Sequence, residues 1–312
     1  MDYVLRGLLV GMASLLTMGC AHDFNLNTMS DPAASPEEQE MEQQLEDDAD
    51  TPEPEEEEEE ELPITEEEEE EDPPDEDDCE DTSDLVYVID RDSEGLYLFS
   101  PDTLTFELLG HLDCSMWGQP SSMGIARDGH AFVRYSTGDV YDVLLEDMSC
   151  TETDYGADFG PFGMGYATQH SETWRDELFL ANKTKLAVID TVTWNLTTIG
   201  SLPSQAELTG NADGELWAFL PLESPAALAE LDKGTGEVIE RISVNDFPSP
   251  SSIDTFAFAT WGGDFWLFVR TYGMGSSTDV YQVTPKGKLT KVLSDVGLNV
   301  VGAGVSTCAP SE

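Results

Sequence analysis

Residues 123–133, MGIARDGHAFV, decide the fold, because their pattern returns as LTGNADGELWAF at 208–219 and as FAFATWGGDFWLF at 256–268. Each copy joins a strand of small and apolar residues to an aromatic-rich strand through Asp-Gly or Gly-Gly, and residues 164–180 form a fourth copy with a longer turn. These residue pairs supply the positive φ angles that two-residue hairpin turns need. The apolar runs are short and lack the 3.6-residue period of a helix, so the sequence predicts an all-β protein.

A second unit alternates with the first and consists of two strands joined by a turn rich in Asp, Thr, Pro and Gly, as at 186–196 and 229–239. Together the two units repeat every 41–49 residues or so, the period of a four-stranded blade, which predicts a β-propeller. A β-sandwich, the main alternative, does not predict the repeat.

The number of blades follows from the strands expected at the centre of the ring. Four inner strands are expected near Met123, Met164, Leu208 and Phe256, whereas the first blade begins at Leu85 without one. The run VVGAGV at 300–305 has no blade of its own. We therefore expect five blades, with this C-terminal strand closing the first.

The N-terminal residues predict export. One basic residue, Arg6, precedes an apolar run that is too short to span a membrane comfortably and ends in LTMGC at 16–20. This ending resembles the lipobox of bacterial lipoproteins, which implies cleavage before Cys20 and diacylation of its thiol. An ordinary secretory signal is the alternative. Without Asp after Cys20, the resemblance implies an outer-membrane lipoprotein, periplasmic or surface-exposed, that touches the membrane only through its lipid.

The charge divides the chain into parts. The net charge is -52, and residues 36–81 hold 29 acidic residues and no Lys or Arg. Such a segment repels itself and does not collapse, so we expect a signal peptide at 1–19, a disordered acidic tether at 20–82 and a propeller at 83–312. The remainder after residue 81 still carries 33 acidic and 12 basic residues. This balance excludes binding of nucleic-acid phosphates or anionic lipid by a basic surface.

Two further resemblances concern the propeller. The hairpin LDKGTG at 231–236 resembles quinoprotein-like and YVTN-type propeller repeats. The lipobox, the acidic spacer and the ending VGAGVSTCAP at 301–310 together resemble uncharacterised lipoproteins of myxobacteria and their relatives. These resemblances imply the fold and the location but no site residues.

The cysteines other than Cys20 are expected to form disulfides. Four remain, namely Cys79, Cys114, Cys150 and Cys308, and an even number in an exported domain allows three connectivities. Closure of the ring by the last strand favours Cys79–Cys308, which leaves Cys114–Cys150. No Cys-x-x-Cys spacing indicates a zinc or redox site.

The candidate site residues are acidic. Glu207 and Asp254 each precede an inner strand, where propeller loops converge, and with Asp128 and Asp213 they are weak candidates for binding calcium or a cationic ligand. No residue is predicted to be catalytic and no other cofactor is expected. A metal-dependent enzyme would need His111, His130 and His170 to meet.

Three functions remain open. The first is a non-catalytic, monomeric binding module for a protein or glycan, since loops on a rigid ring suit recognition. Exposed aromatic residues would serve it, and the candidates are Trp117, Trp174, Trp194 and Tyr272. The second is a metal-assisted hydrolase or lyase, and the third is a passive acidic coat protein.

Overall fold

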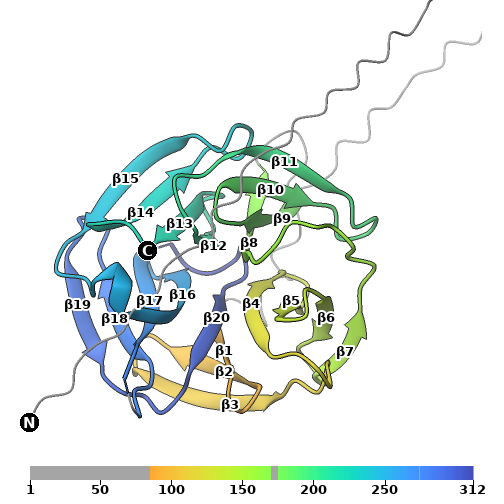
Figure 1. The fold of residues 1–312 in the computed structure, drawn as a ribbon, viewed down its shortest axis with the longest axis horizontal. Helices are drawn as coiled ribbons and strands as arrows, with labels where there is room; N and C mark the ends of the chain where they lie inside the picture. The colour runs from red at the N-terminus through yellow and green to blue at the C-terminus, as the bar shows by residue number, and fades with distance from the viewer. Residues whose placement is uncertain (1–84, 170–174, 274, 312) are drawn as a thin grey trace, which may run out of the picture. The chain divides into compact units, whose positions relative to one another are not determined.

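The computed structural model describes residues 85–169, 175–273 and 275–311. All of them belong to the second of the two units into which the chain divides, residues 68–312. They form five antiparallel sheets of four strands each, set around an axis as the blades of a β-propeller (Figure 1). The predicted fold class and blade number are confirmed.

Each blade has its innermost strand next to the axis (Figure 1). Counted from the inside, the blades are β20-β1-β2-β3, β4–β7, β8–β11, β12–β15 and β16–β19. The strands of the first two blades are β20 (Val300–Gly304), β1 (Val86–Asp90), β2 (Gly95–Ser100), β3 (Thr105–His111), β4 (Pro120–Ile125), β5 (His130–Tyr135), β6 (Val140–Leu144) and β7 (Ser149–Glu152). Those of the third and fourth blades are β8 (Gly163–Gln169), β9 (Arg175–Ala181), β10 (Lys185–Ile189), β11 (Leu196–Ser201), β12 (Glu207–Gly210), β13 (Leu216–Leu220), β14 (Ala226–Leu231) and β15 (Val238–Val244). The fifth blade holds β16 (Ile253–Trp261), β17 (Asp264–Thr271), β18 (Asp279–Val283) and β19 (Leu289–Leu293), preceded by the 3-10 turn η2 (Pro250–Ser252).

The C-terminal strand closes the ring. Strand β20 pairs antiparallel with β1, with Val88 opposite Ala303 and Ile89 opposite Gly302. On its other sides β20 contacts the inner strands β4 and β16 of the neighbouring blades. The predicted closure of the first blade is therefore confirmed, and it joins segments that lie more than 200 residues apart.

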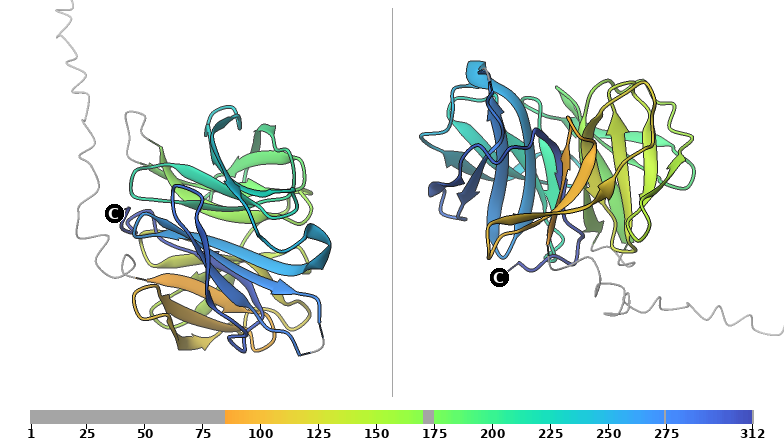
Figure 2. Two further views of the ribbon diagram at one scale, coloured as in Figure 1. Left: turned by 90° about the vertical axis from the view of Figure 1, so that its left-hand side faces the viewer. Right: turned by 90° about the horizontal axis from the view of Figure 1, so that it is seen from below.

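The core lies between the blades. The buried apolar residues fall into five clusters, and each cluster joins the facing sides of two neighbouring blades. Phe99 of the first blade, for example, meets Phe268 of the fifth edge-to-face at 5.3 Å between ring centroids. Burial on both faces explains why a strand such as β13, the second of its blade, is apolar throughout. Figure 2 shows the blades from the side.

The inner strands approach one another closely at the axis. A Cβ on Gly210 of β12 would lie 2.1 Å from the carbonyl oxygen of Tyr166 on β8, which no side chain could occupy. Thr260 at the end of β16 donates a hydrogen bond to the Gly210 carbonyl at 2.6 Å. The short distance between neighbouring inner strands thus requires small residues in them, as the sequence pattern predicts.

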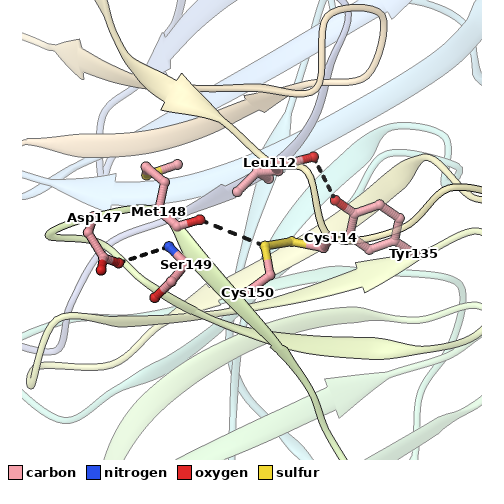
Figure 3. The surroundings of a disulfide bond; sticks show 7 residues. All are labelled: Leu112, Cys114, Tyr135, Asp147, Met148, Ser149 and Cys150. Atoms are coloured by element: carbon pink, nitrogen blue, oxygen red, sulfur yellow. Dashed lines mark hydrogen bonds between the residues drawn. A yellow bond between two sulfur atoms is a disulfide. The ribbon is translucent and has the colours of Figure 1, made fainter.

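One predicted disulfide is present among the described residues. Cys114, in the connection from β3 to β4, is bonded to Cys150 on the outermost strand of the second blade, with 5.3 Å between the Cα atoms (Figure 3). Cys308 is also disulfide-bonded. Its predicted partner, Cys79, lies outside the described residues, so the Cys79–Cys308 pairing stays a prediction.

The predicted signal peptide, Cys20 and the acidic tether lie outside the described residues as well. Within the part of the chain that the structure describes, no helix has the length and apolar character needed to cross a membrane.

Candidate functional site

The five inner strands begin at the same end of the ring, and residues near their starts enclose a cavity of about 170 Å³, here named the axial pocket. Its walls come from every blade, because Ser121, Glu207, Thr255 and Val301 lie on inner strands and Phe162 precedes one. The remaining lining residues are Arg91, Arg134, Pro161, Gln205, Asp254 and Phe256. A concave site with a few polar groups among apolar side chains is the usual form of a ligand pocket.

Arg134 supplies a positive charge to the wall of this pocket. It lies on β5, where its side chain reaches back over the inner strand β4, and it is only 7% exposed. Its Nη1 donates to Ser121 Oγ at 2.9 Å, and its guanidinium lies 5.0 Å from the centre of the Phe162 ring. Its Nε is buried and has no hydrogen-bond partner among the described residues. Burial lowers the pKa of Arg134, but a guanidinium remains charged in proteins.

Glu207 is the buried acid of the pocket. Its carboxylate Oε2 accepts a hydrogen bond from Ser122 Oγ at 3.1 Å, and Ser122 Oγ itself accepts one from the Met164 backbone N–H at 3.1 Å. The carboxyl carbon lies so close to β8 that a Cβ on Gly163 would come within 2.7 Å of it. Burial raises the pKa of Glu207 to about 8, while Ser122 and Arg134 oppose that rise. At neutral pH this carboxyl is therefore mostly protonated and uncharged.

The other charged groups leave the pocket with an excess of positive charge. Asp254 lies 3.4 Å from Arg270 Nη1, so its charge is offset within the fifth blade. The side chain of Arg91 forms no hydrogen bond or ion pair with any of the described residues, although its backbone N–H donates to the Asn299 carbonyl at 2.9 Å. Two guanidinium groups without a carboxylate partner thus face a cavity in a domain that is otherwise acidic.

At the opposite end of the axis, here named the closed end, the arginine Arg127 is paired with a carboxylate. Arg127 donates from Nε and Nη2 to the two carboxylate oxygens of Asp176, each at 2.7 Å. Thr168 and Thr307 add hydrogen bonds to the same pair. Lys233 donates to the backbone carbonyls of Thr168 and Gly214. These contacts tie the second, third and fourth blades to the residues after β20.

The structure brings together two of the four candidate acidic residues. Glu207 and Asp254 line one pocket. Asp128 and Asp213 do not join them, because they follow the ends of β4 and β12 and all inner strands run in the same direction. Asp213 instead lines a separate cavity of about 220 Å³ at the closed end, with Glu215, whose carboxylate accepts hydrogen bonds from Asn211 and Trp217.

The two histidines that the structure describes do not meet at the axis. His130, on the second blade, bonds to Asp142 through Nδ1 at 2.7 Å, which raises the pKa of its imidazole. His111 lies on the first blade, with its Nδ1 3.0 Å from the Ser93 carbonyl oxygen of the same blade. His170 lies outside the described residues. Among the residues that the structure describes, no group of three or more His, Cys, Asp or Glu side chains is placed to hold a metal ion.

The aromatic candidates differ in exposure. Trp117 and Tyr272 are 87% and 67% exposed. Trp194 packs against Phe132, with 5.6 Å between the ring centroids, and so belongs to the packing between the second and third blades. Trp174 lies outside the described residues.

Sequence reasoning missed Arg134 and Arg91. The available signal was a single charged residue inside the apolar run AFVRY at 131–135, in a domain with few basic residues. A charge within a fully buried strand needs a polar cavity or a partner.

Comparisons with known proteins give structural likeness alone. No protein-family model matches the chain, and neither does any curated protein. A protein of unknown function from Bacteroides caccae is similar over 71% of this chain and 98% of its own, at 9% identity and a TM-score of 0.40. A protein of unknown function from Bacteroides thetaiotaomicron is similar over 73% of this chain and 62% of its own, at 13% identity and a TM-score of 0.43.

An auxiliary nutrient binding protein from Bacteroides thetaiotaomicron is similar over 67% of this chain and 57% of its own, at 12% identity and a TM-score of 0.39. The chain thus spans less than two thirds of both Bacteroides thetaiotaomicron proteins. Likenesses this distant say nothing of what this chain binds.

Proposed function

We propose that this protein is a lipid-anchored binding module of the cell envelope, and that its propeller receives its ligand at the axial pocket. The observation that carries the proposal is the pair Arg91 and Arg134, which line a pocket built by all five blades and have no ion pair with a carboxylate among the described residues. A ligand that accepts hydrogen bonds from these guanidinium groups would gain charge-assisted contacts. A lipid on Cys20 and the acidic segment 20–82 would hold the ring off the outer membrane.

A glycan suits this pocket better than a protein surface. The pocket is a small cavity at the centre of the ring, so it receives a terminal group and not an extended face. Two of the exposed aromatic side chains, Trp117 and Tyr272, lie outside its lining, so they are not needed for this contact.

The pocket does not favour calcium. Calcium sites gather several oxygen ligands of negative or neutral charge, whereas this cavity presents two guanidinium groups and a carboxyl that is mostly protonated. Ligand binding should therefore be the same with calcium and with chelator.

Binding is tested with the full chain, purified from cells in its oxidised form and exposed to immobilised envelope glycans and envelope proteins. The wild type should be retained, the Arg134→Met variant should not, and Arg241→Met, which removes an exposed arginine of β15, should behave as the wild type. Retention that is the same for all three proteins would place the binding surface elsewhere.

The anchor is tested separately. Cys20→Ser should move the protein from the membrane fraction to the soluble fraction and abolish labelling by a fatty-acid probe, because one residue carries all the lipid. A variant that stays in the membrane fraction and keeps its label would refute lipid anchoring at this cysteine.

A further inference from the structure

The axial pocket combines three kinds of surface that together define a ligand class. The first is positive charge, from Arg91 and Arg134. The second is a set of polar groups that suit hydroxyls, from Gln205, Asp254 and the protonated Glu207. The third is an apolar wall, from Phe256 and Val301. We infer that the pocket binds the carboxylate of an acidic sugar, a uronic acid residue, with its ring against the apolar wall. This inference rests on the proposed function.

The charged side chains of the pocket suit a ligand with a single negative charge. A guanidinium binds a carboxylate through two parallel N–H···O bonds, and two guanidinium side chains, Arg91 and Arg134, line this cavity. Arg270 lies 3.4 Å from Asp254 and offsets its charge only in part, so a doubly charged phosphate suits this cavity less well than a singly charged carboxylate. The chain after residue 81 holds 33 acidic and 12 basic residues, so its net charge repels anions, and an anion needs a local excess of positive charge such as these two arginines provide.

The neutral state of Glu207 is part of the fit. An ionised carboxylate at this position would repel the ligand's carboxylate in a poorly solvated site. A protonated carboxyl removes that repulsion and offers an O–H donor instead. Burial against β8 and Gly163 is what keeps the carboxyl in this state.

The size of the cavity suits one sugar residue of a glycan chain. The cavity of about 170 Å³ is smaller than the several hundred Å³ of sites that enclose drug-sized ligands. It opens at the end of the ring, so the rest of a glycan would extend away from the pocket into solvent. The polar groups then contact ring hydroxyls, which a simple carboxylic acid lacks.

Titration calorimetry of the full oxidised chain tests the inference with D-glucuronate and an oligomer of galacturonate as probes. D-Glucose is the matched neutral sugar, and lactate is the matched hydroxy acid without a ring. Phosphate and a glutamate-rich peptide test two other carriers of negative charge. We expect the two uronates to bind, glucose not to bind and lactate to bind at least 10-fold more weakly than glucuronate.

Arginine variants connect this binding to the pocket. Arg91→Gln should weaken glucuronate binding about 10-fold or more, the usual effect of losing one charge-assisted hydrogen bond. It removes a side chain with no partner among the described residues, so the fold should be unaffected. Arg134→Met should abolish the binding, and Arg241→Gln on the outer strand β15 should leave it unchanged.

The outcomes separate the inference from the proposed function. If envelope glycans or proteins bind through Arg134 but glucuronate neither binds nor competes with them, the proposed function stands and the inference is wrong. Tighter binding of phosphate or of the glutamate-rich peptide than of glucuronate also overturns the inference. Glucuronate binding that Arg91→Gln and Arg134→Met leave intact contradicts both.

Discussion

The two ends of the propeller axis each hold an arginine, and the surroundings of the two arginines differ. Arg127 at the closed end has a bidentate contact with Asp176 and two threonine hydroxyls around it. Arg134 at the axial pocket has one serine hydroxyl, one aromatic ring and a buried Nε without a partner among the described residues. A satisfied buried arginine holds strands together, whereas an unsatisfied one leaves binding capacity for a ligand. The comparison predicts opposite effects of mutation at the two ends.

The largest effect is expected at the buried acid of the pocket. The pKa of Glu207 rises from 4.5 to about 8 on folding, so between these pH values the folded state holds a proton that the unfolded state has lost. The stability that this group gives is therefore lost as pH rises through that window. Its magnitude is about 5 kcal/mol, at roughly 1.4 kcal/mol for each pKa unit.

The pH effect is measured by comparing the wild type with Glu207→Gln in denaturant unfolding at pH 5 and pH 8.5. The glutamine cannot ionise, so the variant should lose less stability than the wild type between the two pH values. Parallel stability curves for the two proteins would show that Glu207 is ionised in the folded protein.

The next effect concerns the closed end. Arg127→Met leaves Asp176 without its cation in a place where the two side chains are 18% and 10% exposed. We expect a loss of about 3 kcal/mol in the free energy of unfolding, since breaking a buried pair leaves an uncompensated charge. Arg241→Met, which breaks the more exposed pair with Glu223, is the control and should cost less than about 1 kcal/mol. Equal losses in the two variants would mean that the Arg127 pair has no special structural role.

The smallest stability effect is expected for Arg134→Met. The change removes a buried charge that has no carboxylate partner, so the stability should change by no more than about 1 kcal/mol in either direction. Ligand binding, in contrast, should be lost in this variant and kept in Arg127→Met. If Arg134→Met unfolds as easily as Arg127→Met, then both arginines are structural and the difference between the ends disappears.

Much of the fold is predictable from the sequence, because the propeller repeats its signals. Asp-Gly at 128–129 and 213–214 and Gly-Gly at 262–263 set three hairpins in register, and the strand 300–305 without a blade of its own indicates how the ring closes. Each signal is local, and the ring results from repeating it.

The site is predictable only in part. The sequence indicates that Glu207 and Asp254 lie near each other, because both stand at the start of an inner strand and all inner strands start at the same end of the axis. Asp128 and Asp213 were misplaced because the direction of the inner strands puts the Asp-Gly turns at the other end. Arg134 was missed because every residue from Ala131 to Tyr135 is buried, so the strand shows no alternation that would reveal the direction of its side chain.

The pairing of β1 with β20 also affects the order in which the blades can fold. The first blade gains its inner strand only after more than 200 further residues have been synthesised, and Asn299 then donates a hydrogen bond to the Asp90 carboxylate across 209 residues. Contacts so distant in sequence form late and slowly, since the long loop must close first. A nascent chain therefore cannot complete its first blade until β20 has been synthesised. A chain that ends prematurely before β20 would never complete its first blade, and a protease would distinguish it from the finished ring.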